Sequence, residues 1–224
     1  MLNNFEKFAV SAGISSNRLN GYQKFINNMI SPTIVEERQL NAVTMDVFSR
    51  LMADRIIFLG TPIDADVSNI ITSQLLYLNS IDSESDIKLF INSPGGEIYS
   101  GLAIYDAMNF VDPQVMTYVM GLAASMASVI LSSGEKGKRY SLPHSKIMIH
   151  QPMGGLSSGT QESDFKIAYE EIKWCKETLY TILSENTGRP ADEIEKDADR
   201  DHWLTAKEAL EYGLIDEIIT KAKN

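Results

Sequence analysis

The 224-residue sequence has one cysteine, three histidines and fewer basic than acidic side chains. The lone Cys175 excludes an internal disulfide and a metal site built from several cysteines. With 20 basic and 30 acidic residues, the net charge of -10 argues against nucleic acid or an anionic membrane as a partner. No apolar run approaches the length of a membrane span, and the N-terminus lacks the blocks of a secretory signal. These absences predict a cytoplasmic protein.

The length and the 44% hydrophobic content allow a sizeable core and favour one α/β domain. Apolar, β-branched segments at 55–59, 87–91 and 115–120 are typical of strands. Each precedes a predicted helix, and the first of these helices is expected to be capped by Asp66. Three strand-helix repeats predict βαβ connections and a sheet whose strand ends gather loops at one edge, where a site is expected. Residues 1–30 are interpreted as an N-terminal extension and candidate propeptide, and residues 31–224 as the single domain.

The stretch YVMGLAASMASVILSS, residues 118–133, predicts a strand that gives way to a buried helix. Gly121 is expected to allow the turn, and the helix is expected from about Ala123. Ser125 would then lie in the first turn, where free N–H groups and the helix dipole stabilise negative charge. The spacing differs from the hydrolase Gly-x-Ser-x-Gly motif, because Ala123 and Ala127 occupy the glycine positions. The alternative is a small packing serine.

Two further features carry chemistry at strand ends. The SPGG turn at 93–96 leaves backbone N–H groups without side-chain cover, although adjacent glycines also occur in plain turns. His150 ends a predicted strand beside a proline, whereas His144 lies in a turn and His202 in a charged segment. His150 is therefore the best candidate for a general base, the alternative being a histidine with a purely structural role.

The acidic segment from Asp197 to Glu208 mimics a calcium-binding loop, but His202 stands where that loop requires glycine. We instead expect Thr205 and Glu208 to form a capping box. The aspartates of this segment are either a solvated surface or the source of one carboxylate that orients His150.

A long helix is predicted from about 162 to 185, with apolar residues three and four apart. It would span roughly 36 Å, so it either packs on its own core or projects and pairs with another subunit.

Together these segments resemble one family. The strings INSPGGEIYSGLAIYD, GLAASMAS, SKIMIHQPMGG and DRDHWLTAKEALEYGLIDEI are similar to those of ClpP, the proteolytic subunit family of Clp proteases. The resemblance runs from about residue 32 to residue 221. It implies a serine endopeptidase with the crotonase-like ββα superhelix and a projecting handle helix at 162–185.

The resemblance also implies the site. Ser125 would be the nucleophile, His150 the base and Asp201 the orienting acid, since Asp201 follows the arginine and precedes the aromatic residues of the family pattern. The backbone N–H groups of Gly96 and Met126 would form the oxyanion hole. Asp199 and Arg200 would be candidates for contacts between rings.

The partners follow from the same resemblance. The family assembles as two stacked heptameric rings, a tetradecamer, around a chamber into which an ATP-dependent AAA+ Clp unfoldase feeds unfolded polypeptides. No cofactor or metal is implied. The chain has no phosphate loop of its own, because 134–139 lacks the required spacing, so ATP would act on the unfoldase.

Some residues depart from the family pattern. Ala127 and Ser128 replace a common Gly-Ala pair, the stretch 155–164 is longer than usual, and residues 1–30 have no counterpart in the pattern. Two alternatives remain: a ring subunit that serves only as a scaffold, and a crotonase-type acyl-CoA enzyme. The first would be expected to lose triad residues, and the second lacks basic residues placed for a nucleotide tail.

Overall fold

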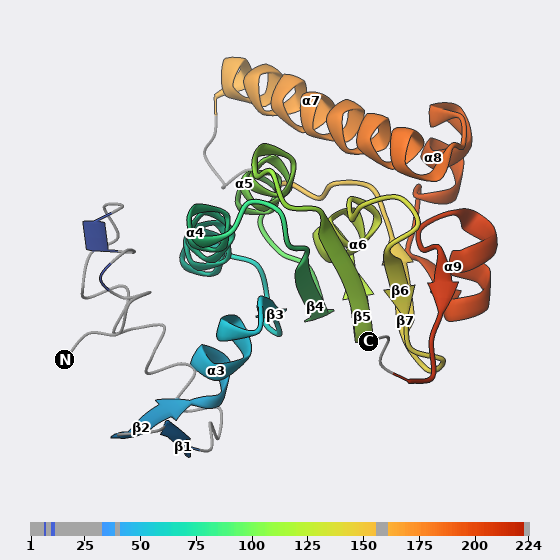
Figure 1. Ribbon diagram of the computed structural model, residues 1–224. Helices are drawn as coiled ribbons and strands as arrows, with labels where there is room; N and C mark the ends of the chain where they lie inside the picture. The colour runs from blue at the N-terminus through green and yellow to red at the C-terminus, as the bar shows by residue number, and fades with distance from the viewer. Residues whose placement is uncertain (1–6, 8–9, 12–32, 39–40, 156–160, 222–224) are drawn as a thin grey trace.

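The computed structural model describes residues 7, 10–11, 33–38, 41–155 and 161–221 (Figure 1). The predicted extension at 1–30 therefore lies almost wholly outside the described residues, as do residues 156–160 of the glycine-rich stretch. In the described part of the chain, no helix is both long and apolar enough to cross a membrane.

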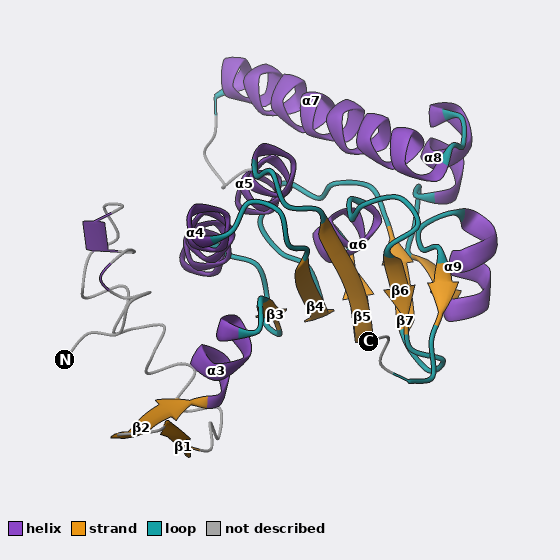
Figure 2. Cartoon of the chain, in the orientation of Figure 1, coloured by secondary structure: helices purple, strands orange, loops and turns teal. Residues whose placement is uncertain are grey.

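Helices and strands alternate through most of the chain, as Figure 2 shows by colour. The strands are β1 Thr33–Arg38, β2 Asn41–Asp46, β3 Ile56–Leu59, β4 Ile87–Ser93, β5 Val115–Ala124, β6 Arg139–Ser141, β7 Lys146–Ile149, β8 His202–Thr205 and β9 Glu217–Ile218. The helices are α3 Val47–Ala53, α4 Ala65–Ile81, α5 Ile98–Phe110, α6 Met126–Ser132, α7 Glu162–Thr187, α8 Ala191–Asp197 and α9 Ala206–Tyr212. The predicted α/β class and the three strand-helix repeats are confirmed.

A seven-stranded sheet forms the centre of the molecule, with the path β3-β4-β5-β6-β9. All pairs on this path are parallel, while β7 pairs parallel with β5 and antiparallel with β8. Along β4 the buried side chains Ile87, Leu89 and Ile91 alternate with the half-buried Lys88 and Phe90, so one face of the sheet carries the core. The core side chains Leu75, Ile87, Leu89 and Ile91 are 0% exposed.

One edge of β5 pairs with two different strands, β6 and β7. Its first half pairs with β6 at 117–119, and its second half pairs with β7 at 122–124. Between the halves, Gly121 has φ +87°, and its N–H donates to Ser145 Oγ. The Ser145 hydroxyl in turn donates to the Val119 carbonyl at 2.9 Å. This buried serine satisfies the backbone at the break and lets β7 continue the sheet toward the strand ends.

Three local predictions were wrong. Asp64, not Asp66, caps α4, because its carboxylate accepts from the Val67 N–H at 2.8 Å. Gly121 is not a turn but part of the irregularity within β5. The helix does not begin at Ala123, because the pairing with β4 and β7 extends the strand to Ala124, and α6 starts only at Met126.

Candidate active site

Ser125 is the junction between β5 and α6. Its backbone has φ 55° and ψ -127°, a region that non-glycine residues rarely occupy and that costs about 1–3 kcal/mol. The conformation is held from both sides: the Ser125 N–H donates to the Met148 carbonyl at 2.9 Å, and the Ser128 hydroxyl donates to the Ser125 carbonyl at 2.6 Å. A strained serine between strand and helix has the geometry of a nucleophile elbow, although the glycine spacing of that motif is absent.

Hydrogen bonds join the three predicted polar residues in the order Ser125, His150 and Asp201. His150 Nε2 is 2.8 Å from Ser125 Oγ, and His150 Nδ1 is 3.0 Å from Asp201 Oδ1. The imidazole is 13% exposed, while the Asp201 carboxylate is 58% exposed. With a proton on Nδ1, the imidazole donates to the carboxylate and can accept the serine proton at Nε2.

Strand register explains why residues so far apart in the chain meet. Ala124 pairs with Met148, and Ile149 pairs with His202, so β5, β7 and β8 end side by side. Each of the three polar residues is the next one beyond its strand: Ser125 after β5, His150 after β7 and Asp201 before β8. The sheet edge therefore brings together the three residues on which the interpretation from sequence depended.

The SPGG turn lies directly against this junction. A Cβ added at Gly95 would lie 2.8 Å from Ser125 Cβ and from the Met126 nitrogen. At Gly96, an added Cβ would lie 2.1 Å from the Ile63 carbonyl oxygen. The turn is fixed by the Ile63 N–H, which donates to Gly95, and by the Glu97 N–H, which donates to Ile63. Only glycine allows this approach of one backbone to another.

Two N–H groups beside Ser125 are candidates for stabilising an oxyanion. Among the residues that the structure describes, no acceptor hydrogen-bonds to the N–H of Gly96 or of Met126. Met126 is the first residue of α6, where helical N–H groups have no partner within the helix. Preorganised N–H donors of this kind stabilise the negative charge that develops on a carbonyl oxygen under attack.

A cavity of about 90 Å³ lies beside Ser125 and His150. Apolar side chains form most of its wall: Ile98, Met126, Val129, Ile149, Met153, Leu179 and Leu183. This mostly apolar wall suits an apolar side chain of a bound peptide. Tyr180 also contributes, and burial, followed by the charges of Glu195 and Asp199, raises the pKa of its phenol to about 12. Tyr180 therefore stays protonated at neutral pH.

The other residues of the acidic segment have different surroundings. Asp197 accepts from the Tyr212 hydroxyl at 2.8 Å, and Asp199 accepts from the Gln151 side chain. Asp199 and Arg200 are exposed, as a contact with another subunit would require. Thr205 and Glu208 form the predicted capping box. Among the described residues, no group of three or more His, Cys, Asp or Glu side chains is arranged to hold a metal ion.

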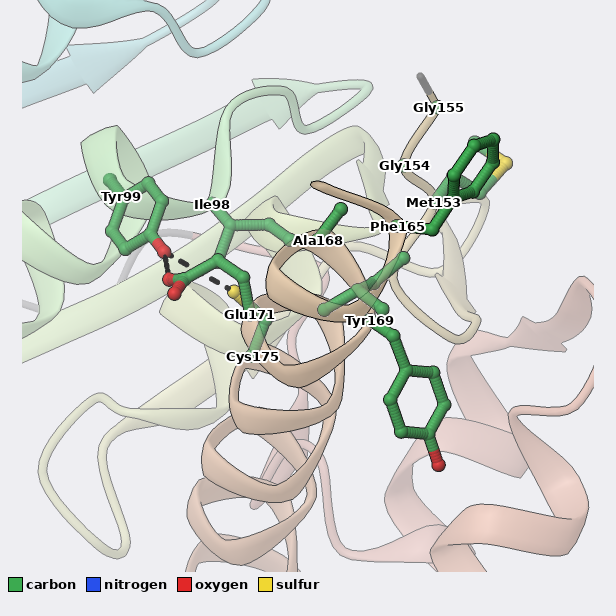
Figure 3. A pocket seen from close by; sticks show the side chains of 11 residues that line it. Ile98, Tyr99, Met153, Gly154, Gly155, Phe165, Ala168, Tyr169, Glu171 and Cys175 are labelled. Carbon is green, nitrogen blue, oxygen red and sulfur yellow. Dashed lines mark hydrogen bonds between the residues drawn. The ribbon is translucent and has the colours of Figure 1, made fainter. Parts of the chain in front are cut away.

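A second, larger groove adjoins the cavity and shares Ile98 and Met153 with it (Figure 3). In this groove Tyr99 of α5 donates a hydrogen bond to Glu171 of α7, and the Cys175 thiol lies 3.8 Å from the Tyr99 hydroxyl. Cys175 is buried, and burial and the Glu171 charge raise the pKa of its thiol, which disfavours the reactive thiolate. Side chains of α7 and of α5, the helix that follows the SPGG turn, line the groove.

Three residues that contact the segments of the site received no individual role from the sequence. Gly95 supports Ser125, Ser145 joins the two halves of β5, and Gln151 binds the segment before Asp201. The only signal in the sequence was adjacency, because Gly95 precedes Gly96 and Gln151 follows His150.

Comparisons with known proteins agree with this architecture. The family model described as "Clp protease" matches residues 38–222. The chain is 54% identical over 221 residues to the "ATP-dependent Clp protease proteolytic subunit" of Porphyromonas gingivalis, covering 98% of this chain and 99% of the relative. A protein with the same name from Bacteroides fragilis is 51% identical, covering 98% and 100%. The "ATP-dependent Clp protease proteolytic subunit 1" of Salinibacter ruber is 50% identical over 190 residues, covering 85% and 81%.

The family model and the relatives differ in how much of the N-terminal segment they match. The family model begins only at residue 38, beyond the predicted extension at 1–30. The Porphyromonas and Bacteroides relatives, however, align with 98% of the chain, so they share most of this extension.

Proposed function

Since the chain belongs to the Clp protease family, we propose that it is a serine endopeptidase with Ser125 as nucleophile, His150 as general base and Asp201 as orienting acid. The observation that carries the proposal is the continuous hydrogen bonding from Asp201 through His150 to Ser125 at one sheet edge. A carboxylate, an imidazole and a serine hydroxyl that are hydrogen-bonded in this order can activate the serine for acyl transfer.

The chemistry begins with proton transfer from the Ser125 hydroxyl to His150 Nε2 as Oγ attacks a peptide carbonyl carbon. The carbonyl oxygen becomes negative and accepts hydrogen bonds from the Gly96 and Met126 N–H groups. The imidazolium, stabilised by Asp201, gives its proton to the leaving amine, and the C–N bond breaks. A water molecule then loses a proton to His150 and attacks the acyl ester, which releases the peptide acid and restores Ser125.

The assembly and the partner belong to the same proposal. The chain forms two stacked heptameric rings in the cytoplasm and degrades unfolded polypeptides delivered by an ATP-dependent AAA+ Clp unfoldase. The names of the relatives support an ATP-dependent complex, and the exposed Asp199 and Arg200 are the proposed contacts between rings. Residues 1–30 are the extension and candidate propeptide, and residues 31–224 form the peptidase domain.

The test is hydrolysis of a short fluorogenic peptide by wild type and by Ser125→Ala, with particle size measured on the same samples. Wild type is expected to be active and Ser125→Ala inactive, and only wild type should react with a fluorophosphonate probe at Ser125. An acyl-CoA enzyme or a scaffold subunit would not react with the probe. Residual turnover by Ser125→Ala at the wild-type level would overturn the proposal.

The choice of Asp201 among the nearby aspartates has its own test. Asp201→Asn should lower kcat by roughly 10⁴-fold, because the amide favours the wrong imidazole tautomer. Asp197→Asn serves as the matched control, since its side-chain oxygen can still accept from the Tyr212 hydroxyl. Equal losses in the two variants would show that Asp201 has no special role.

A further inference from the structure

In the single chain, the carboxylate proposed to orient His150 is open to solvent. Asp201 is 58% exposed, while His150 is 13% exposed. Water competes for the hydrogen bonds of an exposed carboxylate, and a pair of exposed charged groups contributes little by itself to a fixed geometry. Some other contact must therefore hold Asp201 beside the imidazole.

The β7-β8 ladder restrains only one side of the His150-Asp201 pair. The last paired residues are Ile149 and His202, so His150 and Asp201 lie just beyond the end of the ladder. Residues beyond the last pair of a ladder fray unless something ties them.

Gln151 supplies contacts on the other side. Its backbone N–H donates to the Ala198 carbonyl at 2.6 Å. Its side-chain Nε2 donates to the Asp199 carbonyl at 2.6 Å, with Asp199 Oδ1 at 3.3 Å. The His150-Asp201 pair is thus enclosed between the strand ladder and these contacts of Gln151.

We propose that Gln151 is a positioning residue that holds the segment before Asp201 by donating hydrogen bonds and so aligns Asp201 with His150. The proposal rests on the proposed triad. Gln151 does not line the cavity that contains Ser125 but faces a separate cavity of about 400 Å³ beside α7 and Glu195. Its effect on the reaction passes through Asp201 and not through contact with the substrate at Ser125.

The donor character of the side chain is the property that matters. Nε2 faces a carbonyl oxygen and a carboxylate oxygen, so this position requires N–H and rejects an acceptor. Gln151→Glu keeps the shape but places a carboxylate against both oxygens. Gln151→Lys changes the shape but keeps a donor and adds a charge opposite to that of Asp199.

The experiment compares wild type with Gln151→Glu, Gln151→Ala and Gln151→Lys in the full chain, by peptide hydrolysis and by the rate of fluorophosphonate labelling. Gln151→Glu should lower kcat and the labelling rate by roughly 10–100-fold while KM changes less than about 3-fold, because misplacing a catalytic group by about 1 Å costs up to about 10²-fold. Gln151→Lys should retain activity within about 5-fold of wild type, and Gln151→Ala should fall between them. Lys196→Gln is the control, because it makes the net charge more negative by one, as Gln151→Glu does, at a side chain of α8 that is 78% exposed. Its activity should match that of wild type.

A purely space-filling role predicts the opposite order, with Gln151→Glu the mildest substitution and Gln151→Lys the most harmful. That order, or Gln151→Glu equal to wild type, would overturn the proposal. Particle size and thermal unfolding are recorded for every variant, and if Gln151→Glu fails to assemble, the order of Gln151→Ala and Gln151→Lys decides. Ser125→Ala in the same assay distinguishes a failure of the triad proposal from a failure of the Gln151 proposal. If Ser125→Ala is active, the triad proposal is overturned. If Ser125→Ala is inactive and Gln151→Glu is as active as wild type, only the role of Gln151 is overturned.

Discussion

At the residue scale, the backbone of Ser125 depends on the absence of a side chain at Gly95. Gly95 has φ +85°, and an added Cβ would lie 2.5 Å from the Ala124 carbonyl oxygen and 2.8 Å from Ser125 Cβ. Such distances do not occur in folded proteins, so the two backbones would have to separate. The strained Ser125 conformation persists only because its surroundings determine it.

Gly95→Ala is therefore expected to lower kcat/KM by about 10²-fold or more, because Ser125 and the Met126 N–H shift relative to His150. Gly137→Ala is the matched control, since Gly137 has nearly the same φ, +86°, but no atom lies within 4 Å of the added Cβ. Gly137→Ala should lose about 1 kcal/mol or more of stability from backbone strain alone, and Gly95→Ala should lose more because its added Cβ also clashes; thermal unfolding measures both losses. Equal activities of the two variants would contradict the role of Gly95.

At the element scale, the Arg139 side chain links its own strand, β6, to α6, to α7 and to Asp216 near β9. Its guanidinium binds both carboxylate oxygens of Asp216, at 2.8 Å and 2.6 Å, and also donates to the carbonyls of Ser132 in α6 and Asn186 in α7. The Arg139 side chain is 4% exposed and the Asp216 side chain 18%. Burial raises the pKa of Asp216, but the hydrogen bonds and charge of Arg139 outweigh this effect, so the net pKa is lowered.

Asp216→Asn should lower the free energy of unfolding by about 3 kcal/mol, because it leaves the buried guanidinium of Arg139 without its counter-charge. Urea unfolding at pH 7 measures the loss. Asp86→Asn is the comparison, since the Lys138–Asp86 pair is roughly a third exposed and should contribute no more than about 1 kcal/mol. A loss at Asp216 no larger than that at Asp86 would contradict the prediction.

The lowered pKa of Asp216 also predicts a pH dependence. Because the carboxylate is held charged in the folded state, its stabilisation is present above the ordinary pKa of 3.8 and is lost as the pH falls through the lower folded-state value. The difference in stability between wild type and Asp216→Asn should therefore be constant near neutral pH and shrink below about pH 4. A difference that stayed constant down to pH 2 would contradict this assignment.

At the scale of the whole molecule, α7 extends along the top of the view in Figure 1. Its second half is buried through Cys175, Leu179 and Ile182, whereas apolar side chains of its first half are exposed: Phe165 56%, Ile167 67% and Tyr169 60%. Phe165 belongs to the apolar residues spaced three and four apart along the helix, and the core does not extend this far along α7. Phe165 and Tyr169 share one face of α7 and Ile167 lies on another, and exposed apolar side chains in this half support its pairing with another subunit.

Ile167→Asp is expected to convert the proposed double ring into particles of half the mass, because a charge in an apolar contact is costly to bury. Sedimentation velocity measures the particle, and Ile167→Leu, which keeps an apolar surface, should sediment as wild type. Peptide hydrolysis on the same samples shows whether the site depends on the contact. Unchanged sedimentation of Ile167→Asp would exclude this half of α7 from the interface.

Local patterns in the sequence predicted most elements well. The repeats of strand and helix, the start of α7 and the Thr205–Glu208 cap depend on neighbours in the chain, and these are visible in the sequence. The family resemblance brought Ser125, His150 and Asp201 together before any coordinates. From the residues alone, the choice among the three aspartates of the acidic segment stayed open.

Hydrophobic period and capping chemistry act over a few residues, so the fold class, the buried segments and the residue types available for catalysis follow from the sequence alone. The tertiary structure was needed to show that β5 continues to Ala124, since pairing with Met148 outweighs the helix preference of two alanines. It also decided that Asp201 and not Asp197 lies beside His150, and that Gln151 holds the intervening segment. These outcomes depend on strand register, which is set by contacts between residues more than 20 positions apart.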